Sequence, residues 1–401
     1  MSNWPELEKR YFMPTVRRLP LTLVRGQGMR VWDDRGRAYL DFVGGWAVNS
    51  LGHCHPVVVE ALVKQAQALI QVSNQFYTVP QVLLAELLVQ NSCLDKIFLC
   101  NSGAEANEGA VKLARRYGKL YLDGAYQVIT AINSFHGRTL AMVAASGQRK
   151  FQEPYTPLPD GFVNVEYNSA GAIKAATSSL TCAVMLEPIQ GEGGVNIPDE
   201  HYLREVAAWC QEKGILLILD EIQTGVGRTG TLFAYEQAGI EPDIMTLAKG
   251  LGSGVAIGAV LAKERASVFA PGDHGSTFGG NPLASAGAYA ALKFIIENNV
   301  PGNARDVGQH LLARLESLRS RFDFIVEVRG RGLLVAVQFD SDIADRIVMA
   351  CLENGLLLNR VKPDALRFMP PLIVNQKEVD EAVDILERVL GEAGKSIIRS
   401  G

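Results

Sequence analysis

Short, almost continuously apolar segments alternate with longer helical stretches through the middle of the chain. The apolar segments are KIFLC (96–100), QVITA (127–131), CAVMLEP (182–188), ILLILDE (215–221) and DIMTLAK (243–249). Each is bounded by Gly, Pro, Asn or Asp, and most are apolar at successive positions. This pattern is typical of parallel strands that are buried on both faces and joined by helical crossovers. We therefore predict a large α/β unit with a mainly parallel sheet.

The two ends of the chain follow different patterns. MRVWDDRGRAYLDF (29–42) alternates and contains a turn at Asp34-Arg35-Gly36, which predicts a hairpin. ASAGAYAALKFIIENN (284–299) reads as a helix, and DFIVEVRGRGLLVAVQF (323–339) again favours strands. We predict a smaller α+β domain built from residues 1–48 and 286–401, around a large domain of residues 49–285.

Composition narrows the class of protein. The chain of 401 residues has 39 Lys and Arg against 43 Asp and Glu, a net charge of −4, and no basic tract, so we expect no nucleic-acid partner. No apolar run approaches the roughly 18 residues of a membrane span, and we expect no membrane partner. The N-terminus lacks the features of a signal or transit peptide. The 6 cysteines are scattered without a Cys-x-x-Cys, which favours reduced thiols in the cytoplasm and no metal site.

Three of the apolar segments end in polar residues that could carry chemistry. KIFLC runs into Asn101-Ser102-Gly103-Ala104-Glu105, ILLIL runs into Asp220, and DIMTLA runs into Lys249. Ligands of open α/β sheets bind beyond the carboxyl ends of the strands, so these residues are candidates for one site. Simpler interpretations exist. Ser102 and Glu105 have the spacing of an ordinary capping box, and Asp220 could cap its strand or pair with Arg228.

Lys249 is the most informative of these residues. A lysine at the end of an apolar strand is unusual, and the Gly-Leu-Gly-Ser-Gly that follows leaves room for a close neighbour. Burial lowers the pKa of a lysine and favours its nucleophilic neutral amine. A lysine, a buried carboxylate and a helix N-terminus that can hold phosphate fit one cofactor well, pyridoxal 5'-phosphate.

Eight ordered motifs resemble those of a known family. They are YLDFVGGWAVNSLGHCHP, CNSGAEANEGAVKLAR, SFHGRTLA, LEPIQGEGGV, LLILDEIQTGVGRTG, TLAKGLGSG, HGSTFGGNPLA and LRFMPPL. The sequence resembles the class III aminotransferases of pyridoxal-phosphate fold type I, most closely the acetylornithine aminotransferases, from about Gly26 to about Leu372. The resemblance implies a seven-stranded sheet in the large domain.

The resemblance implies a set of cofactor contacts. Lys249 would form the Schiff base and shuttle the proton, and Asp220 would bond the pyridine nitrogen. The other implied contacts are Gln223 to the phenolic oxygen, Ser102, Gly103 and Ala104 to the phosphate, and Phe135 stacked on the ring. Thr277 would reach the phosphate from the other subunit, which implies a homodimer with shared active sites.

The resemblance also implies how substrates bind. Arg138 and Arg367 would bind carboxylates, and Ser276, which precedes Thr277, is a further implied substrate contact. Glu192 would pair with Arg367 while an amine end is bound and would move aside for the second carboxylate of 2-oxoglutarate. Trp46 departs from the family pattern, because acetylornithine enzymes usually carry an aliphatic residue there and ornithine enzymes a tyrosine. It could narrow the space for an acyl group or stack on it.

The implied reaction is a ping-pong transfer of the δ-amino group of N2-acetyl-L-ornithine to 2-oxoglutarate, a step of arginine biosynthesis. Within the family, ornithine, succinylornithine, 4-aminobutyrate or a carrier-linked lysine are alternative donors. From a different class, a non-catalytic nucleotide-binding α/β protein is the alternative. The absence of a Gly-x-Gly-x-x-Gly turn after an early strand argues against it.

Overall fold

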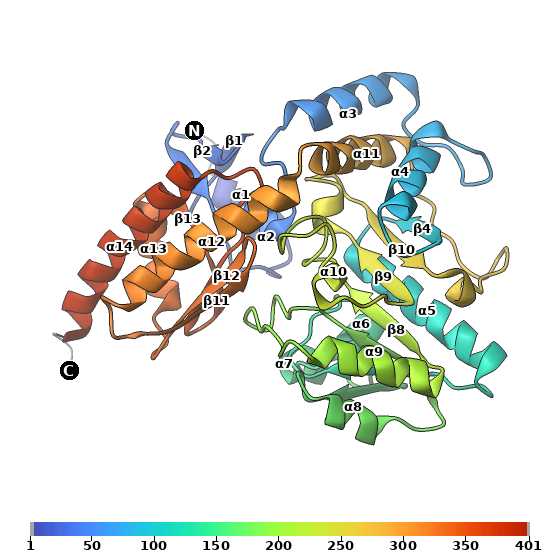
Figure 1. Cartoon of the computed structure of the whole chain (residues 1–401). Coiled ribbons are helices and arrows are strands. Elements are labelled where there is room, and N and C mark those ends of the chain that lie inside the picture. Colours follow the sequence, from blue (N-terminus) through green and yellow to red (C-terminus); the bar gives the residue numbers. More distant parts are fainter. Residues whose placement is uncertain (1–3, 399–401) are drawn as a thin grey trace.

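The computed structural model describes residues 4–398, and a seven-stranded sheet forms the centre of its larger unit (Figure 1). β10 is antiparallel to β4 and β9, and the other neighbours are parallel. This confirms the predicted α/β class and the mainly parallel sheet. In spatial order the strands are β4 (Lys96–Cys100), β10 (Gly258–Ala262), β9 (Ile244–Leu247), β8 (Leu216–Asp220), β7 (Thr181–Leu186), β5 (Gln127–Ala131) and β6 (Phe162–Val165).

Helices cover both faces of this sheet, which explains its continuously apolar strands. In β8, Leu216 and Ile218 join the core beneath α5 (Gly103–Tyr121), whereas Leu217 and Leu219 join the core beneath α9 (Tyr202–Lys213). Because successive side chains of a strand point to opposite faces, every residue of β8 is buried. The sheet is therefore rigid where its strands end and the candidate site begins.

Two smaller sheets join the two ends of the chain. The first contains β1 (Leu23–Gln27), β2 (Arg30–Asp33), β3 (Ala38–Asp41) and β13 (Leu356–Leu357). The second contains β11 (Ile325–Arg331), β12 (Leu334–Phe339), β15 (Ala365–Phe368) and β14 (Asn359–Lys362). The predicted hairpin is present as β2 and β3, and β13 pairs in parallel with β3. N-terminal and C-terminal strands thus share one sheet, while the domain boundaries at residues 48 and 285 stay a prediction.

Apart from α5 and α9, the longer helices form two groups in Figure 1. One group lies beside the large sheet and contains α3 (Pro56–Ala68), α4 (Val79–Gln90) and α11 (Pro282–Glu297). The other lies over the smaller sheets and contains α12 (Val300–Arg319), α13 (Ala344–Glu353) and α14 (Gln376–Ile398). The shorter helices are α2 (Gly44–Ala47), α6 (Leu140–Ala145), α7 (Arg149–Gln152), α8 (Ala170–Ala176) and α10 (Tyr235–Ala238).

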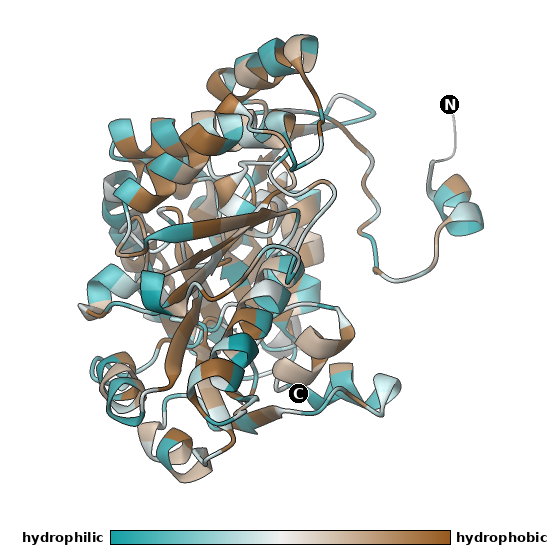
Figure 2. Cartoon of the chain, turned by 90° about the vertical axis from the view of Figure 1, so that its right-hand side faces the viewer, coloured by the Kyte–Doolittle hydropathy of each residue, from teal (hydrophilic) through white to brown (hydrophobic). Residues whose placement is uncertain are grey.

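The N-terminal helix differs from all of these. α1 (Trp4–Tyr11) stands away from the rest of the chain in Figure 2, and none of its residues is buried. Across residues 4–398, the helices are too short or too polar for any of them to cross a membrane.

Candidate active site

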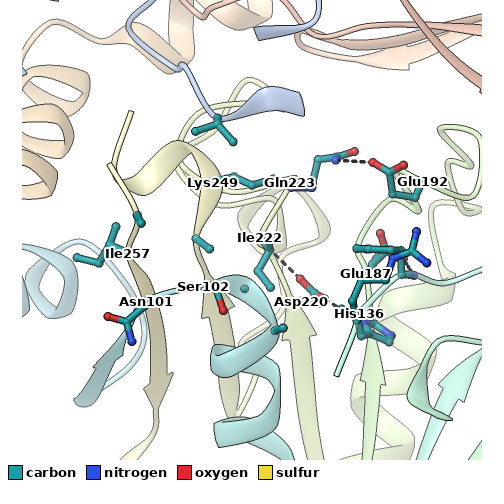
Figure 3. A pocket seen from close by; sticks show the side chains of 18 of the residues that line it. Asn101, Ser102, His136, Glu187, Glu192, Asp220, Ile222, Gln223, Lys249 and Ile257 are labelled. Atoms are coloured by element: carbon teal, nitrogen blue, oxygen red, sulfur yellow. Dashed lines mark hydrogen bonds and ion pairs between the residues drawn. The ribbon is translucent and has the colours of Figure 1, made fainter. Parts of the chain in front are cut away.

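A cavity of about 480 Å³ opens where β4, β8 and β9 end (Figure 3). It lies beyond the carboxyl ends of parallel strands, where open α/β sheets bind their ligands. The predicted site residues that line it are Ser102, Gly103, Ala104, Phe135, Arg138, Glu192, Asp220, Gln223 and Lys249. The fold thus brings together residues that are far apart in the sequence.

Asp220, the last residue of β8, accepts hydrogen bonds on both carboxylate oxygens. Its Oδ2 accepts from Asn107 Nδ2 at 2.7 Å and lies 2.8 Å from His136 Nδ1, while its Oδ1 accepts from the Ile222 amide at 3.0 Å. Asn107 is itself held, because its Oδ1 accepts from Thr246 Oγ1 at 2.7 Å. These donors offset the desolvation of a carboxylate that is 3% exposed and fix its orientation.

Lys249 lies two residues after the end of β9 and lines the same cavity. Burial lowers the pKa of its amine, and Arg367 lowers it further, while Glu192 and Asp220 act in the opposite direction. Among the described residues, its Nζ has neither a hydrogen-bond partner nor an ion-pair partner. Its φ of 34° is unusual for a residue with a side chain. A half-buried lysine with a positive φ and no partner among the described residues is placed to bond something that enters the cavity.

The N-terminus of α5 forms another wall of the cavity. Ser102 caps the helix by accepting from the Glu105 amide at 3.2 Å, and Glu105 Oε2 accepts from the Asn101 amide at 2.6 Å. The amides of Gly103 and Ala104 have no intrahelical acceptor, so they can bind an anion at the positive end of the helix. A side chain at 103 would collide with Ile222, because its Cβ would lie 2.8 Å from Ile222 Cδ1.

Glu192 and Arg367 form an ion pair at the edge of the cavity. Arg367 Nη2 lies 2.8 Å from Glu192 Oε1, and Arg367 also donates to Asn359 Oδ1 and to Gln223 Oε1. Arg367 is 1% exposed, whereas the side chain of Glu192 is 32% exposed. Burial would raise the pKa of Glu192, but the charges of Arg367 and Lys249 lower it below the usual value. The arginine is therefore fixed by several partners, and the glutamate by fewer.

Arg138 approaches the cavity from the loop that follows β5. Its guanidinium lies 3.8 Å from the centre of the Phe151 ring and 5.3 Å from that of Phe135. It forms no ion pair with the described residues. An exposed arginine that rests on aromatic rings keeps its hydrogen-bond donors free for a carboxylate.

The remaining predicted residues do not line the cavity within this chain. Ser276 Oγ accepts from Asn101 Nδ2 at 3.0 Å, so it lies next to the cavity wall, while Thr277 is exposed. Trp46 is 52% exposed and belongs to α2, where Gly44, Gly45, Trp46 and Ala47 all have φ between 56° and 64°. This is one turn of left-handed backbone, which two glycines make less costly. Of the residues that line the cavity, Val48 is the nearest to Trp46 in the sequence.

Three residues of the site did not stand out in the sequence. Asn107 and His136 hold Asp220, and Glu187 accepts from the amides of Phe135 at 2.9 Å and Gly191 at 3.1 Å. Burial raises the pKa of Glu187 to about 7, although His136 acts against this. Asn107 lies on the buried face of α5, and His136 follows Phe135 in the sequence. A polar residue at a buried position was the signal that could have identified them.

One alternative for Asp220 is wrong. Arg228 does not pair with it, because its Nη1 donates to the carbonyl oxygens of Leu333 at 3.0 Å and Pro370 at 2.6 Å. The cap interpretation is correct in part, since Asp220 accepts from the Ile222 amide. The neighbouring Glu221 has a structural role, with both oxygens bonded to the amides of Ala234 and Tyr235.

Comparison with known proteins agrees with this geometry. The family model of the class-III aminotransferases matches residues 11–390. The acetylornithine aminotransferase of Caldanaerobacter subterraneus subsp. tengcongensis is 51% identical over 96% of this chain and 98% of its own length. The acetylornithine aminotransferase of Methanocaldococcus jannaschii is 48% identical over 98% of this chain and 99% of its own length.

Solved structures show the same fold. The ornithine aminotransferase of Toxoplasma gondii superposes with a TM-score of 0.94 at 35% identity, covering 98% of this chain and 95% of that one. The N-acetylornithine aminotransferase of Stenotrophomonas maltophilia gives a TM-score of 0.84 at 37% identity, with coverage of 98% and 99%. The predicted fold type I architecture is therefore confirmed, and the alternative of a non-catalytic nucleotide-binding protein is excluded.

Pyridoxal phosphate is the cofactor of the class III family, and the residues of this cavity fit it. The Nζ of Lys249 lacks a partner among the described residues, the Asp220 carboxylate is held by His136 and Asn107, and the free amides of α5 suit a phosphate. The Nε2 of His136 is buried and has no hydrogen-bond partner among the described residues. The chain belongs to the class III aminotransferases, and it is a pyridoxal-phosphate-dependent transaminase.

Proposed function

We propose that this transaminase transfers the δ-amino group of N2-acetyl-L-ornithine to 2-oxoglutarate, a step of arginine biosynthesis. The observation that carries the proposal is the similarity over nearly the whole chain to relatives named acetylornithine aminotransferase. The arrangement of charges in the cavity supports it. Two arginines, one free and one paired with a movable glutamate, suit an amine donor with one carboxylate and an acceptor with two.

The residues of the chain divide the work of the reaction. When bound, pyridoxal phosphate supplies an aldehyde for the amino group and a ring that accepts electrons from the reacting carbon. Lys249 holds the proton at Nζ that is moved to and from this carbon, and its lowered pKa makes the neutral amine available. Asp220 would hold a proton on the ring nitrogen of the bound cofactor, and Arg138 orients the carboxylate of the donor.

Glu192 adapts the site to both substrates. While it pairs with Arg367 at 2.8 Å, this part of the site is neutral and accepts the amine end of a donor that has no second carboxylate. When 2-oxoglutarate binds, its second carboxylate takes the place of Glu192 on Arg367. Because Arg367 stays bonded to Asn359 and Gln223, it remains in position after Glu192 has left.

We further propose a homodimer with shared active sites. Exposed apolar side chains gather on α3, on α4, on the segment between them and beside Thr277. They are Val59, Val63, Leu69, Ile70, Phe76, Tyr77, Val79, Val82 and Phe278. Gln71 and Asn74 bind the backbone of residues 276–279 to this face. Such a surface suits an interface, and a partner's Thr277 would complete the phosphate site.

The 6 free cysteines suit a reducing compartment, and we propose that the enzyme works in the cytoplasm.

A titration of the first half-reaction tests the proposed donor. The holoenzyme is mixed with N-acetylornithine, ornithine or 4-aminobutyrate without a keto acid, and the visible absorbance of the bound cofactor is followed. We expect the fastest loss of absorbance with N-acetylornithine, which would also show that Trp46 leaves space for the acyl group. Faster loss with ornithine would contradict the proposed donor and would point to Trp46 as the reason.

A further inference from the structure

A second cavity of about 600 Å³ lies beside the active-site cavity, and Glu192 lines both. Its other ionisable lining residues are Arg149, Lys150 and Lys362. Among the described residues, none of these cations forms an ion pair, and the Nζ of Lys150 lies 4.8 Å from the centre of the Phe151 ring. The second cavity is therefore a positively charged space next to the one carboxylate that the reaction has to displace.

Lys362 is the cation best placed for Glu192. It is half-buried at the end of β14, and its Nζ lies 3.0 Å from where a Cβ of Gly194 would be. The Cα atoms of Gly194 and Glu192 are at most ~7.6 Å apart, since consecutive Cα atoms are about 3.8 Å apart. A glutamate side chain and the length of an ion pair together cover this separation, so the carboxylate of Glu192 can reach the amine of Lys362. Arg149 and Lys150, by contrast, are exposed.

The backbone around Glu192 is held in place, so the side chain can move alone. The Gly191 amide donates to Glu187 Oε2 at 3.1 Å, and Arg329 donates to the carbonyl of Gly194 at 2.6 Å. Gln190 and Asn196 also pair with each other across the loop. Rotation about the side-chain bonds of Glu192 is then enough to carry its carboxylate from one cavity to the other.

β14 links the two positions of the carboxylate. Asn359, at the start of this strand, accepts from Arg367, and Lys362 ends the same strand. A carboxylate that left Arg367 without finding a new cation would carry an unpaired charge in a partly buried place. A lysine in the second cavity removes much of this cost.

We propose that the second cavity receives the carboxylate of Glu192 when a dicarboxylate binds Arg367, and that Lys362 is its partner there. The inference rests on the proposed function, because it gives the displaced glutamate of that mechanism a destination. Lys362 is then a positioning residue for the second half-reaction, and it touches neither substrate nor cofactor.

Binding of two unreactive acids to the holoenzyme tests this. Glutarate carries two carboxylates, and pentanoate has the same chain length with one. Dissociation constants are measured by calorimetry for Lys362→Met, for Lys362→Arg, and for Lys150→Met as the matched control from the same cavity. We expect Lys362→Met to weaken glutarate binding about three- to tenfold and to leave pentanoate within about twofold. Lys362→Arg should restore glutarate binding, and Lys150→Met should not weaken it.

The Glu192→Gln background separates the possible explanations. If Lys362 acts through Glu192, Lys362→Met has no further effect on glutarate binding in this background. An equal effect in both backgrounds would mean that Lys362 attracts the ligand itself, and would overturn the inference, as would no effect of Lys362→Met in the wild type. If Glu192→Gln leaves the ratio of glutarate to pentanoate affinity unchanged, the proposed displacement of Glu192 is itself wrong.

Discussion

The hydrogen bonds of Asp220 allow a quantitative prediction for Asp220→Asn. The substitution keeps the size of the side chain but leaves it one acceptor oxygen. In one orientation the new amide NH2 faces the Ile222 amide, which lies 3.0 Å from Oδ1 in the wild type. In the other it faces Asn107 Nδ2 and His136 Nδ1, at 2.7 and 2.8 Å from Oδ2. Either way at least one buried donor loses its acceptor.

Leaving a buried donor without a partner costs about 1–3 kcal/mol. We therefore expect the free energy of unfolding of the cofactor-free protein to fall by about 1–3 kcal/mol in Asp220→Asn. Urea denaturation at one fixed protein concentration measures this. Asp342→Asn is the matched control, because Asp342 is exposed and has no hydrogen bond within residues 4–398.

The same variant tests the catalytic role. Asp220→Asn removes the negative charge that would hold a proton on the ring nitrogen of the cofactor, so the donor half-reaction should slow by about 10²–10⁴-fold. An unfolding free energy within about 0.5 kcal/mol of the wild type would refute the hydrogen-bond reasoning. A wild-type rate of the half-reaction would refute the role of Asp220.

The remaining predictions concern other residues of the site and core. Lys249→Ala should slow transamination by at least roughly 10²–10⁴-fold with the circular dichroism spectrum unchanged, and turnover at the wild-type rate would refute its role. Arg138→Ala should raise the KM of both substrates, whereas Glu192→Ala should mainly change the ratio of the two half-reaction rates. Equal losses in both half-reactions of Glu192→Ala would count against the switch. Burial raises the pKa of Glu221 from its usual 4.5 to about 7, so the folded state holds its proton more tightly. The free energy of unfolding of the wild type, relative to that of Glu221→Gln, should then fall as pH rises from about 4.5 to about 7. Urea denaturation of both proteins at the two ends of this range measures the change, and a relative stability that rises with pH would contradict the reasoning.

Residues at the ends of core strands were the ones that sequence reasoning could place. Lys249, Asp220 and Ser102 each follow a segment whose apolar pattern marks it as a buried strand, and the sheet rule brings such ends together. β6 and β10 escaped the same reasoning. β6 is an edge strand whose residues are only half-buried, and β10 runs antiparallel after a glycine-rich stretch.

Partners across the fold could not be read from local patterns. His136 and Asp220 are 84 positions apart, and Asn107 and Asp220 are 113 apart. Arg228 shows that nearness in the sequence does not predict a contact either. It is near Asp220 in sequence, but its guanidinium binds the backbone carbonyls of Leu333 and Pro370, which lie in loops next to β12 and β15. The resemblance supplied Glu192, Arg367 and the pairing between them, and the structure adds that Arg367 is also held by Asn359 and Gln223.

Mapping the covalent attachment of the cofactor tests the central claim most directly. The holoenzyme is reduced with borohydride, which fixes a lysine-bound pyridoxal phosphate, and its peptides are analysed by mass spectrometry. We predict that the added mass is found on Lys249, within MTLAKGLGSG (residues 245–254). Attachment to a different lysine, or none in a preparation that transaminates, would contradict the account.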